Sequence, residues 1–298
     1  MRFSYFYRGI ANHKRMIGEL VEARVDCITL NDTCCAFILE SPQTVLERVG
    51  RDLADAGIRV RALHAPFGRE ANLSDIREDR RLGTLGRHLS LIGRLPLLGI
   101  PILHIHPGAD EQQDVYGQDP RRLKEILRRS LTDLVSAAGT AGVTLALENM
   151  PASLGSPEEL VEIMHWFDSP RLGVLLDTGH AHVRDGVARS FQTVREHLVD
   201  FHVHDNSGLR DDHLQPPYGT IDWAAFLSGL AGCPAAEVLT IEALPWGRAG
   251  LARMARETEA FFGGRLPSCR IGGRKAIARC PVCGHILLED PKEPACCC

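Results

Sequence analysis

The chain repeats one pattern of hydrophobic and polar positions eight times. A short apolar run is followed by a polar stretch and then by a segment with the spacing of an amphipathic helix. Each run has the length of a strand buried on both faces, as in a parallel sheet. The eight predicted strands are Phe3–Tyr7, Val25–Leu30, Ile58–Leu63, Pro101–Ile105, Val143–Leu147, Leu172–Leu176, Val199–Val203 and Val238–Ile241.

Residues that favour helix ends lie between these runs. Asp222 precedes a predicted helix that begins at Trp223, and Gly57 and Gly142 stand where helices are expected to end. Three further helices are predicted to begin at a capping side chain followed by proline: Ser41-Pro42, Asp119-Pro120 and Ser156-Pro157-Glu158-Glu159.

Strands that alternate with helices form either a closed barrel or a doubly wound parallel sheet. The count of eight favours the barrel, so the predicted fold is an α/β (β/α)8 TIM barrel, for which about 250 residues are typical. We expect the barrel to occupy residues 1–263 and its last helix to end near Phe262. Residues 264–298 then form a separate Cys-rich tail, predicted to be metal-binding or partly disordered.

Six consecutive predicted strands end in His, Asp or Glu. In a TIM barrel the carboxyl ends of the strands meet at one mouth, where catalytic residues gather. Imidazoles and carboxylates brought together there are the normal ligands of a divalent cation. The sequence therefore predicts a metal site. The six strand ends carry His64, His104 with His106, Glu148, Asp177 with His180, His202 with His204 and Asp205, and Glu242.

The loop after the seventh strand adds Asp211 and His213, two positions apart on a segment expected to be extended. Both a solvated acidic loop and a further set of ligands or substrate contacts fit this pattern.

At these residues the sequence resembles the xylose isomerase-like TIM-barrel superfamily, also called AP endonuclease family 2. The resemblance covers roughly residues 1–262 and is strongest in HVHDNSGLRDDHLQPPYGTIDW, with DTGHAH before it. This superfamily includes sugar and sugar-phosphate isomerases and epimerases, and also AP endonucleases of the endonuclease IV type.

The resemblance implies that Glu148, Asp177, His202 and Glu242 form the shared metal quartet. It also implies that five further residues match positions that complete a three-zinc cluster in the endonuclease branch: His64, His106, His180, Asp211 and His213. Gly179 and the stretch from His204 to Asn206 are more like the isomerase branch.

Three functions are compatible with these residues. The first is a metal-dependent sugar or sugar-phosphate isomerase or epimerase, in which Glu148 and Glu242 move a proton next to a carbonyl and the metal (Mn, Mg, Co or Zn) stabilises an enediolate. The second is a zinc-dependent, endonuclease IV-like phosphodiesterase. The third is a non-catalytic barrel that binds a metabolite.

Arginines that follow the strand ends are candidates for binding a substrate phosphate or carboxylate: Arg69, Arg184, Arg210 and Arg248. Trp246 is a candidate for stacking on a sugar. In the tail, Cys280 and Cys283 resemble one knuckle of a zinc ribbon, and Cys269 and His285 are candidate ligands of the same second, structural zinc ion.

The formal net charge of −4 argues against nucleic acid as a partner and favours a small sugar. The chain has no apolar run long enough to span a bilayer, and its first residues lack the layout of a secretion signal. We therefore expect a cytoplasmic protein without a membrane partner. Barrels of this type often pair, so a homodimer is a further expectation.

Overall fold

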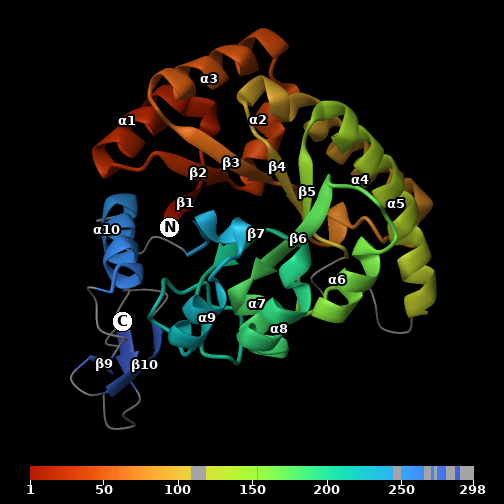
Figure 1. The fold of residues 1–298 in the computed structure, drawn as a ribbon. Helices are drawn as coiled ribbons and strands as arrows, with labels where there is room; N and C mark the ends of the chain where they lie inside the picture. The colour runs from red at the N-terminus through yellow and green to blue at the C-terminus, as the bar shows by residue number, and fades with distance from the viewer. Residues whose placement is uncertain are drawn as a thin grey trace.

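The computed structural model of the protein describes residues 1–108, 119–152, 154–243 and 250–264, together with three short strands beyond them. In the described part, eight parallel strands close into a barrel in sequence order, with β1 paired to β8 (Figure 1). The strands are β1 (Arg2–Tyr7), β2 (Cys27–Leu30), β3 (Arg59–His64), β4 (Ile102–Ile105), β5 (Thr144–Glu148), β6 (Leu172–Asp177), β7 (Leu198–Val203) and β8 (Val238–Ile241). The prediction of a TIM barrel is confirmed, and each predicted strand overlaps an observed one.

Helices surround the barrel and cover the outer face of the sheet (Figure 1). The α-helices are α1 (His13–Ala23), α2 (Cys35–Glu40), α3 (Gln43–Asp55), α4 (Glu78–Arg94), α5 (Pro120–Ala141), α6 (Pro157–Met164), α7 (Thr178–Arg184), α8 (Val187–Val194), α9 (Trp223–Gly229) and α10 (Gly250–Phe262). The short 3-10 helices are η1 (Ile10–Asn12), η2 (Asp32–Cys34), η3 (Arg69–Ala71), η4 (Leu95–Leu98), η6 (Arg195–His197) and η7 (Pro234–Glu237). No helix in the described ranges has the length and apolar character that a membrane span requires.

Most of the predicted helix boundaries are observed. Ser156 and Glu159 form a reciprocal capping box at α6, and the Asp119 and Asp222 side chains cap α5 and α9. Gly142 ends α5 in the left-handed conformation that glycine adopts without strain.

The prediction that Ser41 caps a helix with Pro42 in its first turn was wrong. Ser41 instead ends α2, where its N–H donates to the Phe37 carbonyl, and α3 begins only at Gln43 without a side-chain cap. Helices α2 and α7 were not predicted because they are too short to show a clear helical period.

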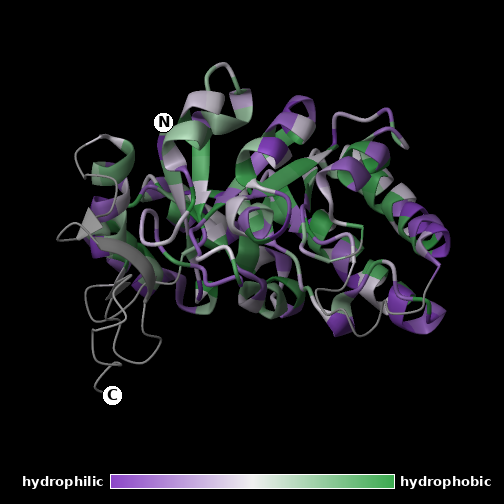
Figure 2. Ribbon diagram, turned by 90° about the horizontal axis from the view of Figure 1, so that it is seen from below, coloured by the Kyte–Doolittle hydropathy of each residue, from purple (hydrophilic) through white to green (hydrophobic). Residues whose placement is uncertain are grey.

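The hydrophobic core has two parts. Figure 2 shows the hydrophobic residues concentrated inside the molecule and the hydrophilic ones on the outer surfaces of the helices. The larger part lies between strands and helices, and the smaller part consists of Ala62, Ile102, Ala146 and Leu175. Those four residues lie two positions before His64, His104, Glu148 and Asp177, and since strand side chains alternate, each pair shares a face.

Three short antiparallel strands lie in the predicted tail: β9 (Arg270–Ile271), β10 (Arg274–Arg279) and β11 (Ile286–Leu288). These strands were not predicted from the sequence, because runs this short have no distinct periodicity.

Candidate metal centre

The carboxyl ends of six strands bring the predicted site residues together. His64, Glu148 and Asp177 are the last residues of β3, β5 and β6, and His202 lies near the end of β7. Strand register places Asp177 directly beside His202. Within these strands and the loops after them, the ligand atoms of three groups lie within 4.8 Å of one another: His64, His106 and Glu148; Glu148, Asp177, His202 and Glu242; and His204, His213 and Glu242.

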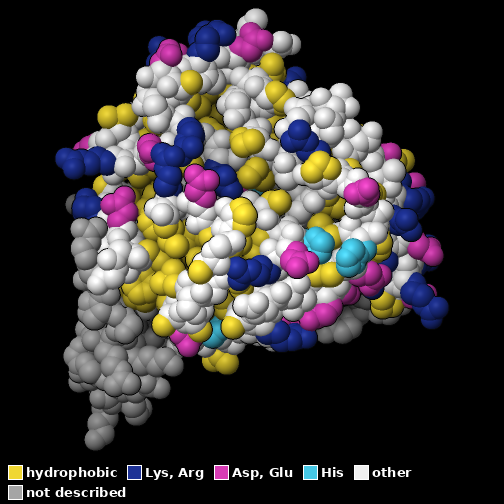
Figure 3. All heavy atoms as spheres, viewed as in Figure 1, with side chains coloured by type: hydrophobic (Ala, Val, Ile, Leu, Met, Phe, Trp, Pro, Cys, Tyr) yellow, Lys and Arg dark blue, Asp and Glu magenta, His cyan; other side chains and the backbone are white. Residues whose placement is uncertain are grey.

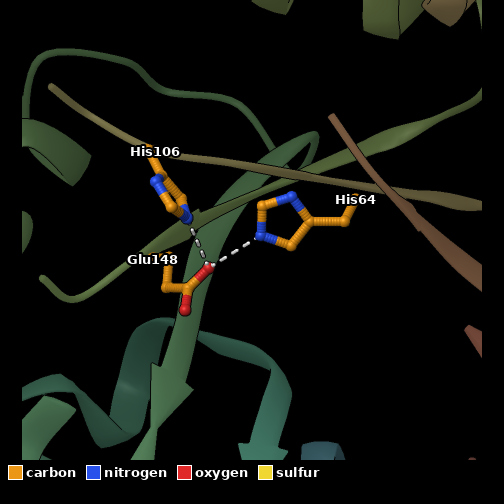
Figure 4. Close-up of side chains that lie close together, drawn as sticks. All are labelled: His64, His106 and Glu148. Atoms are coloured by element: carbon orange, nitrogen blue, oxygen red, sulfur yellow. Dashed lines mark ion pairs between the residues drawn. The ribbon is translucent and has the colours of Figure 1, made fainter. Parts of the chain in front are cut away.

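Glu148 joins the first two groups through its two carboxylate oxygens. Its Oε2 atom lies 3.4 Å from His64 Nε2 and 3.2 Å from His106 Nε2 (Figure 4). Its Oε1 atom faces the other way, 3.1 Å from His202 Nδ1 and 3.4 Å from His180 Nδ1. A single buried carboxylate is therefore placed between two sets of nitrogen atoms.

His202 Nδ1 faces three carboxylates at once. It lies 3.1 Å from Glu148 Oε1, 2.9 Å from Glu242 Oε2 and 3.8 Å from Asp177 Oδ2. One N–H group can donate well to only one of these oxygens. A cation that binds the nitrogen and all three carboxylates satisfies the whole group.

Two buried carboxylate oxygens of this group lack a hydrogen bond. Glu148 Oε2 and Glu242 Oε2 are both buried and accept no hydrogen bond within the described part of the chain. An uncompensated buried carboxylate costs several kcal/mol. This donor set, with charged oxygens and imidazole nitrogens directed at one point, fits a divalent cation.

Three other imidazoles present Nε2 to the centre. His64 Nδ1 donates to the Ala65 carbonyl at 2.7 Å, and His180 Nδ1 donates to the Asn149 carbonyl at 2.9 Å. His213 Nδ1 donates to the Glu242 carbonyl at 3.0 Å. A backbone carbonyl only accepts, so each ring carries a proton on Nδ1, and Nε2 is the atom that would bind a cation.

Asp211 lies between two of these imidazoles. Its Oδ2 atom is 3.3 Å from His180 Nε2 and 2.8 Å from His213 Nε2. His213 has a φ of 47°, in the left-handed region that few non-glycine residues adopt. The loop after β7 thus brings Asp211 and His213 together beside His180, and their role as further ligands or substrate contacts stays a prediction.

The electrostatics of the centre reflect the balance of carboxylates and imidazoles. Burial alone would lower the pKa of His202, but the carboxylates of Glu242 and Glu148 outweigh it and raise that pKa well above its usual value. Burial would also lower the pKa of His213, and Asp211 raises it to about 10. Conversely, burial would raise the pKa of Glu242, yet His202 holds it well below its ordinary value.

His204 was named among the polar residues at the strand ends but was not assigned a role as a ligand. Its Nε2 atom lies 3.0 Å from Asp177 Oδ2, and its ring stacks on His213 with a centroid distance of 4.1 Å. Its Nδ1 atom is buried without a hydrogen bond in the described structure. The sequence does contain a signal for His204, because His202 and His204 lie two positions apart at the end of one strand and so share a face.

The predicted substrate-binding arginines do not point uniformly at the centre. Arg184 donates to the Met150 and Ala152 carbonyls and so holds the loop after β5. Arg210 is 72% exposed and pairs with Asp212, and Arg69 is exposed at the start of η3. Six further candidate residues lie outside the described side chains: Trp246, Arg248, Cys269, Cys280, Cys283 and His285.

A family model described as the xylose isomerase-like TIM barrel matches residues 19–256. The chain belongs to this family. A curated relative, the uncharacterized protein MJ1311 of Methanocaldococcus jannaschii, is 30% identical over 191 residues, which are 60% of this chain and 63% of the relative. The match therefore spans less than two thirds of that relative's length.

Solved structures of the same fold include D-psicose 3-epimerase from Clostridium cellulolyticum H10. Its TM-score is 0.75 at 17% identity, covering 90% of this chain and 100% of the epimerase. The IOLI protein with a bound zinc atom has a TM-score of 0.70 at 19% identity, covering 89% of this chain and 100% of that protein. At these identities the likeness establishes a shared fold.

Proposed function

We propose that this chain is a metal-dependent isomerase or epimerase of a sugar or sugar phosphate. The observation that carries the proposal is the placement of Glu148 and Glu242. They end β5 and follow β8, and from these separate strands both direct an oxygen at His202 Nδ1, at 3.1 and 2.9 Å. Two carboxylates that approach one point from two sides are suited to removing and returning a proton.

Glu148, Asp177, His202 and Glu242 would hold the cation, which is Mn, Mg, Co or Zn. When bound, a divalent cation supplies a Lewis acid that stabilises negative charge on the oxygens of an enediolate. One glutamate takes the proton from the carbon next to the carbonyl, and the other returns a proton to the opposite face or to the neighbouring carbon.

The neighbours of the same fold support this assignment. One is an epimerase of a ketohexose and another carries zinc. The surface agrees with a small-molecule partner more than with a nucleic acid. On the face shown in Figure 3, basic and acidic side chains of the described residues are interspersed without a continuous basic patch.

The test is proton exchange. The purified protein, loaded with Mn²⁺, is incubated in D₂O with a panel of ketohexoses, ketopentoses and their phosphates. We expect deuterium at the carbon next to the carbonyl of at least one sugar, together with its epimer or isomer, and no deuterium with Glu148→Gln. Exchange that persists in this variant would contradict the proposed proton transfer.

One observation favours a second function, a zinc-dependent phosphodiesterase. The His64–His106–Glu148 group and the His180–Asp211–His213 group add ligands beyond those that one cation needs. Two or three zinc ions could then activate water against a phosphodiester. Metal analysis separates the two functions: about one equivalent per chain supports the isomerase, whereas three of zinc and cleavage of DNA at abasic sites support the phosphodiesterase.

A further inference from the structure

His202 differs from the other imidazoles of the centre in the nitrogen atom that it presents. His64, His180 and His213 donate from Nδ1 to backbone carbonyls and present Nε2. His202 presents Nδ1, and its Nε2 lies 2.9 Å from His104 Nδ1. An imidazole can donate or accept at either nitrogen, so His104 alone does not decide where the proton of His202 lies.

Asp200 resolves this ambiguity. Its Oδ2 atom lies 3.1 Å from His104 Nε2, and a carboxylate only accepts, so His104 carries its proton on Nε2. His104 Nδ1 is then an acceptor, and His202 must donate to it from Nε2. In neutral His202 the lone pair is then on Nδ1, the atom that faces the Glu148 and Glu242 carboxylates at 3.1 and 2.9 Å and that would bind a cation.

The carboxylate of Asp200 is itself held in one orientation. The Phe201 N–H donates to Oδ1 at 2.8 Å, and Arg61 Nε lies 3.3 Å from the carboxylate. Arg61 also lines a cavity at the opposite, amino-terminal ends of the strands. The chain of contacts therefore runs from the amino-terminal end of the barrel, through Asp200 and His104, to His202 at the mouth.

All three inner members of this chain are fully buried. The side chains of Asp200, His104 and His202 have no exposed surface. Asp200 and His202 lie two positions apart on β7 and so share a face, whereas His104 lies on β4. A carboxylate enclosed in a barrel is costly unless its hydrogen bonds are complete, and here they are completed by groups that lead to the metal quartet.

We propose that Asp200 and His104 are positioning residues that hold His202 with its proton on Nε2 and its Nδ1 free to bind a divalent cation. The inference rests on the metal quartet of the proposed function. It adds two residues that touch neither metal nor substrate and that act through the orientation and tautomer of one ligand.

The most direct test is the Asp200→Asn variant, which keeps the shape of the side chain and reverses the direction of its hydrogen bond with His104. The amide oxygen must face the Phe201 N–H and Arg61, which are donors. The amide NH₂ group therefore faces His104 Nε2 and moves the proton of His104 to Nδ1. His104 then donates to His202 Nε2, and the remaining proton of neutral His202 lies on Nδ1, where the metal should bind.

Zinc affinity and the tautomer of His104 are measured on the full-length chain. Wild type and Asp200→Asn are labelled with ¹⁵N-histidine, titrated with Zn²⁺ against a chelator, and compared by two-bond ¹H–¹⁵N spectra. We expect the proton of His104 on Nε2 in wild type and on Nδ1 in the variant. We also expect zinc binding to weaken by about 10- to 100-fold, the range for partners of metal ligands.

Two further variants keep the test decisive. If Asp200→Asn does not fold, His104→Phe removes the same connection and should also weaken zinc binding at least tenfold. Thr29→Val is the matched control. Thr29 is buried among the strands and bonds Ser4 and Thr240 through its hydroxyl, without a hydrogen bond to the metal quartet. The Thr29→Val variant should lose stability but keep the zinc affinity of the wild type.

Wild-type zinc affinity in Asp200→Asn, or in His104→Phe, would overturn the proposal. So would an equal loss of affinity in Thr29→Val, since general disturbance of the interior would then explain the effect. A wild-type protein that binds zinc but exchanges no sugar proton contradicts only the proposed function. A wild-type protein that binds no divalent cation contradicts both.

Discussion

The imidazole ring of His204 lies directly against the backbone of Gly179. A Cβ atom on Gly179 would come within 1.8 Å of His204 Cε1, far inside van der Waals contact. The Asn206 side chain closes the same contact by donating to the Gly179 carbonyl at 2.9 Å. Only glycine permits this approach of α7 to the end of β7, and the approach brings His204 beside Asp177.

Gly179→Ala should therefore displace His204 and disturb Asp177. We expect a loss of about 1–3 kcal/mol in the free energy of unfolding, as for other overpacked sites, and a weaker metal affinity. Gly83→Ala is the control, because Gly83 is exposed in α4 with no atom near its missing Cβ. It should stabilise the protein slightly. Equal melting temperatures for the two variants would show that the contact has no energetic consequence.

Glu148→Gln should lose both metal binding and turnover. The amide keeps the shape but removes the negative charge that faces His202 on one side and His106 on the other. We expect the metal affinity to fall by more than about 100-fold, beyond the effect of removing an outer partner of a ligand. Isothermal titration with Mn²⁺ measures the affinity. A variant with full activity and its metal intact would remove Glu148 from the proton transfer.

His202→Ala and His64→Ala should differ in metal content. His202 faces Glu148 Oε1 within the quartet, whereas His64 faces Glu148 Oε2 outside it. His202→Ala is expected to abolish binding of the quartet's cation, and His64→Ala is expected to retain about one equivalent per chain. Elemental analysis of the two purified variants checks this. Loss of all metal from His64→Ala would mean that the two groups bind as a single unit.

His88 should make the fold less stable in acid. Burial lowers its pKa to about 4 from an ordinary value near 6.5, while its Nδ1–H donates to the Thr84 carbonyl. The unfolded chain thus takes up a proton first as the pH falls. The contribution of His88 to the free energy of unfolding is therefore fully present above about pH 6.5. It is lost as the pH falls toward 4, and the loss amounts to about 3 kcal/mol for this one group.

His88→Gln removes this titration while retaining a donor for the carbonyl. Urea unfolding of wild type and variant between pH 7 and pH 4 should therefore give curves that converge as the pH falls. Parallel curves over that range would contradict the assigned pKa. His104, whose pKa burial also lowers to about 4, contributes in the same direction to both proteins, so the difference between them isolates His88.

Deletion of the chain beyond Gly264 should leave a folded barrel with its main metal bound. Every proposed ligand of the quartet precedes that point, and α10 ends at Phe262, whose ring packs against Phe3 and Trp223. The melting temperature and metal content of the truncated protein decide the matter. A large fall in either would show that the tail stabilises the barrel and that the predicted boundary is wrong.

The sequence by itself determined the barrel and the set of residues at its mouth. Buried parallel strands appear in a sequence as short apolar runs, and the first polar residue after each run marks the end of the strand. The alternation of such runs with helices therefore identified the eight strands and placed His64, Glu148 and Asp177 at one end. Local helix caps such as the capping box of Ser156 and Glu159 could also be predicted, because the two partners are only three residues apart in the sequence.

Only the tertiary structure decided which atoms face each other. The opposite orientations of Glu148 Oε1 and Oε2, the contact of His204 with Gly179, and the path from Asp200 through His104 to His202 all join residues 25 or more positions apart. Such pairs leave no local pattern in the chain, since strand alternation specifies the face of a residue but not its partner across the barrel. Closure of the sheet, which pairs β1 with β8, sets those partners.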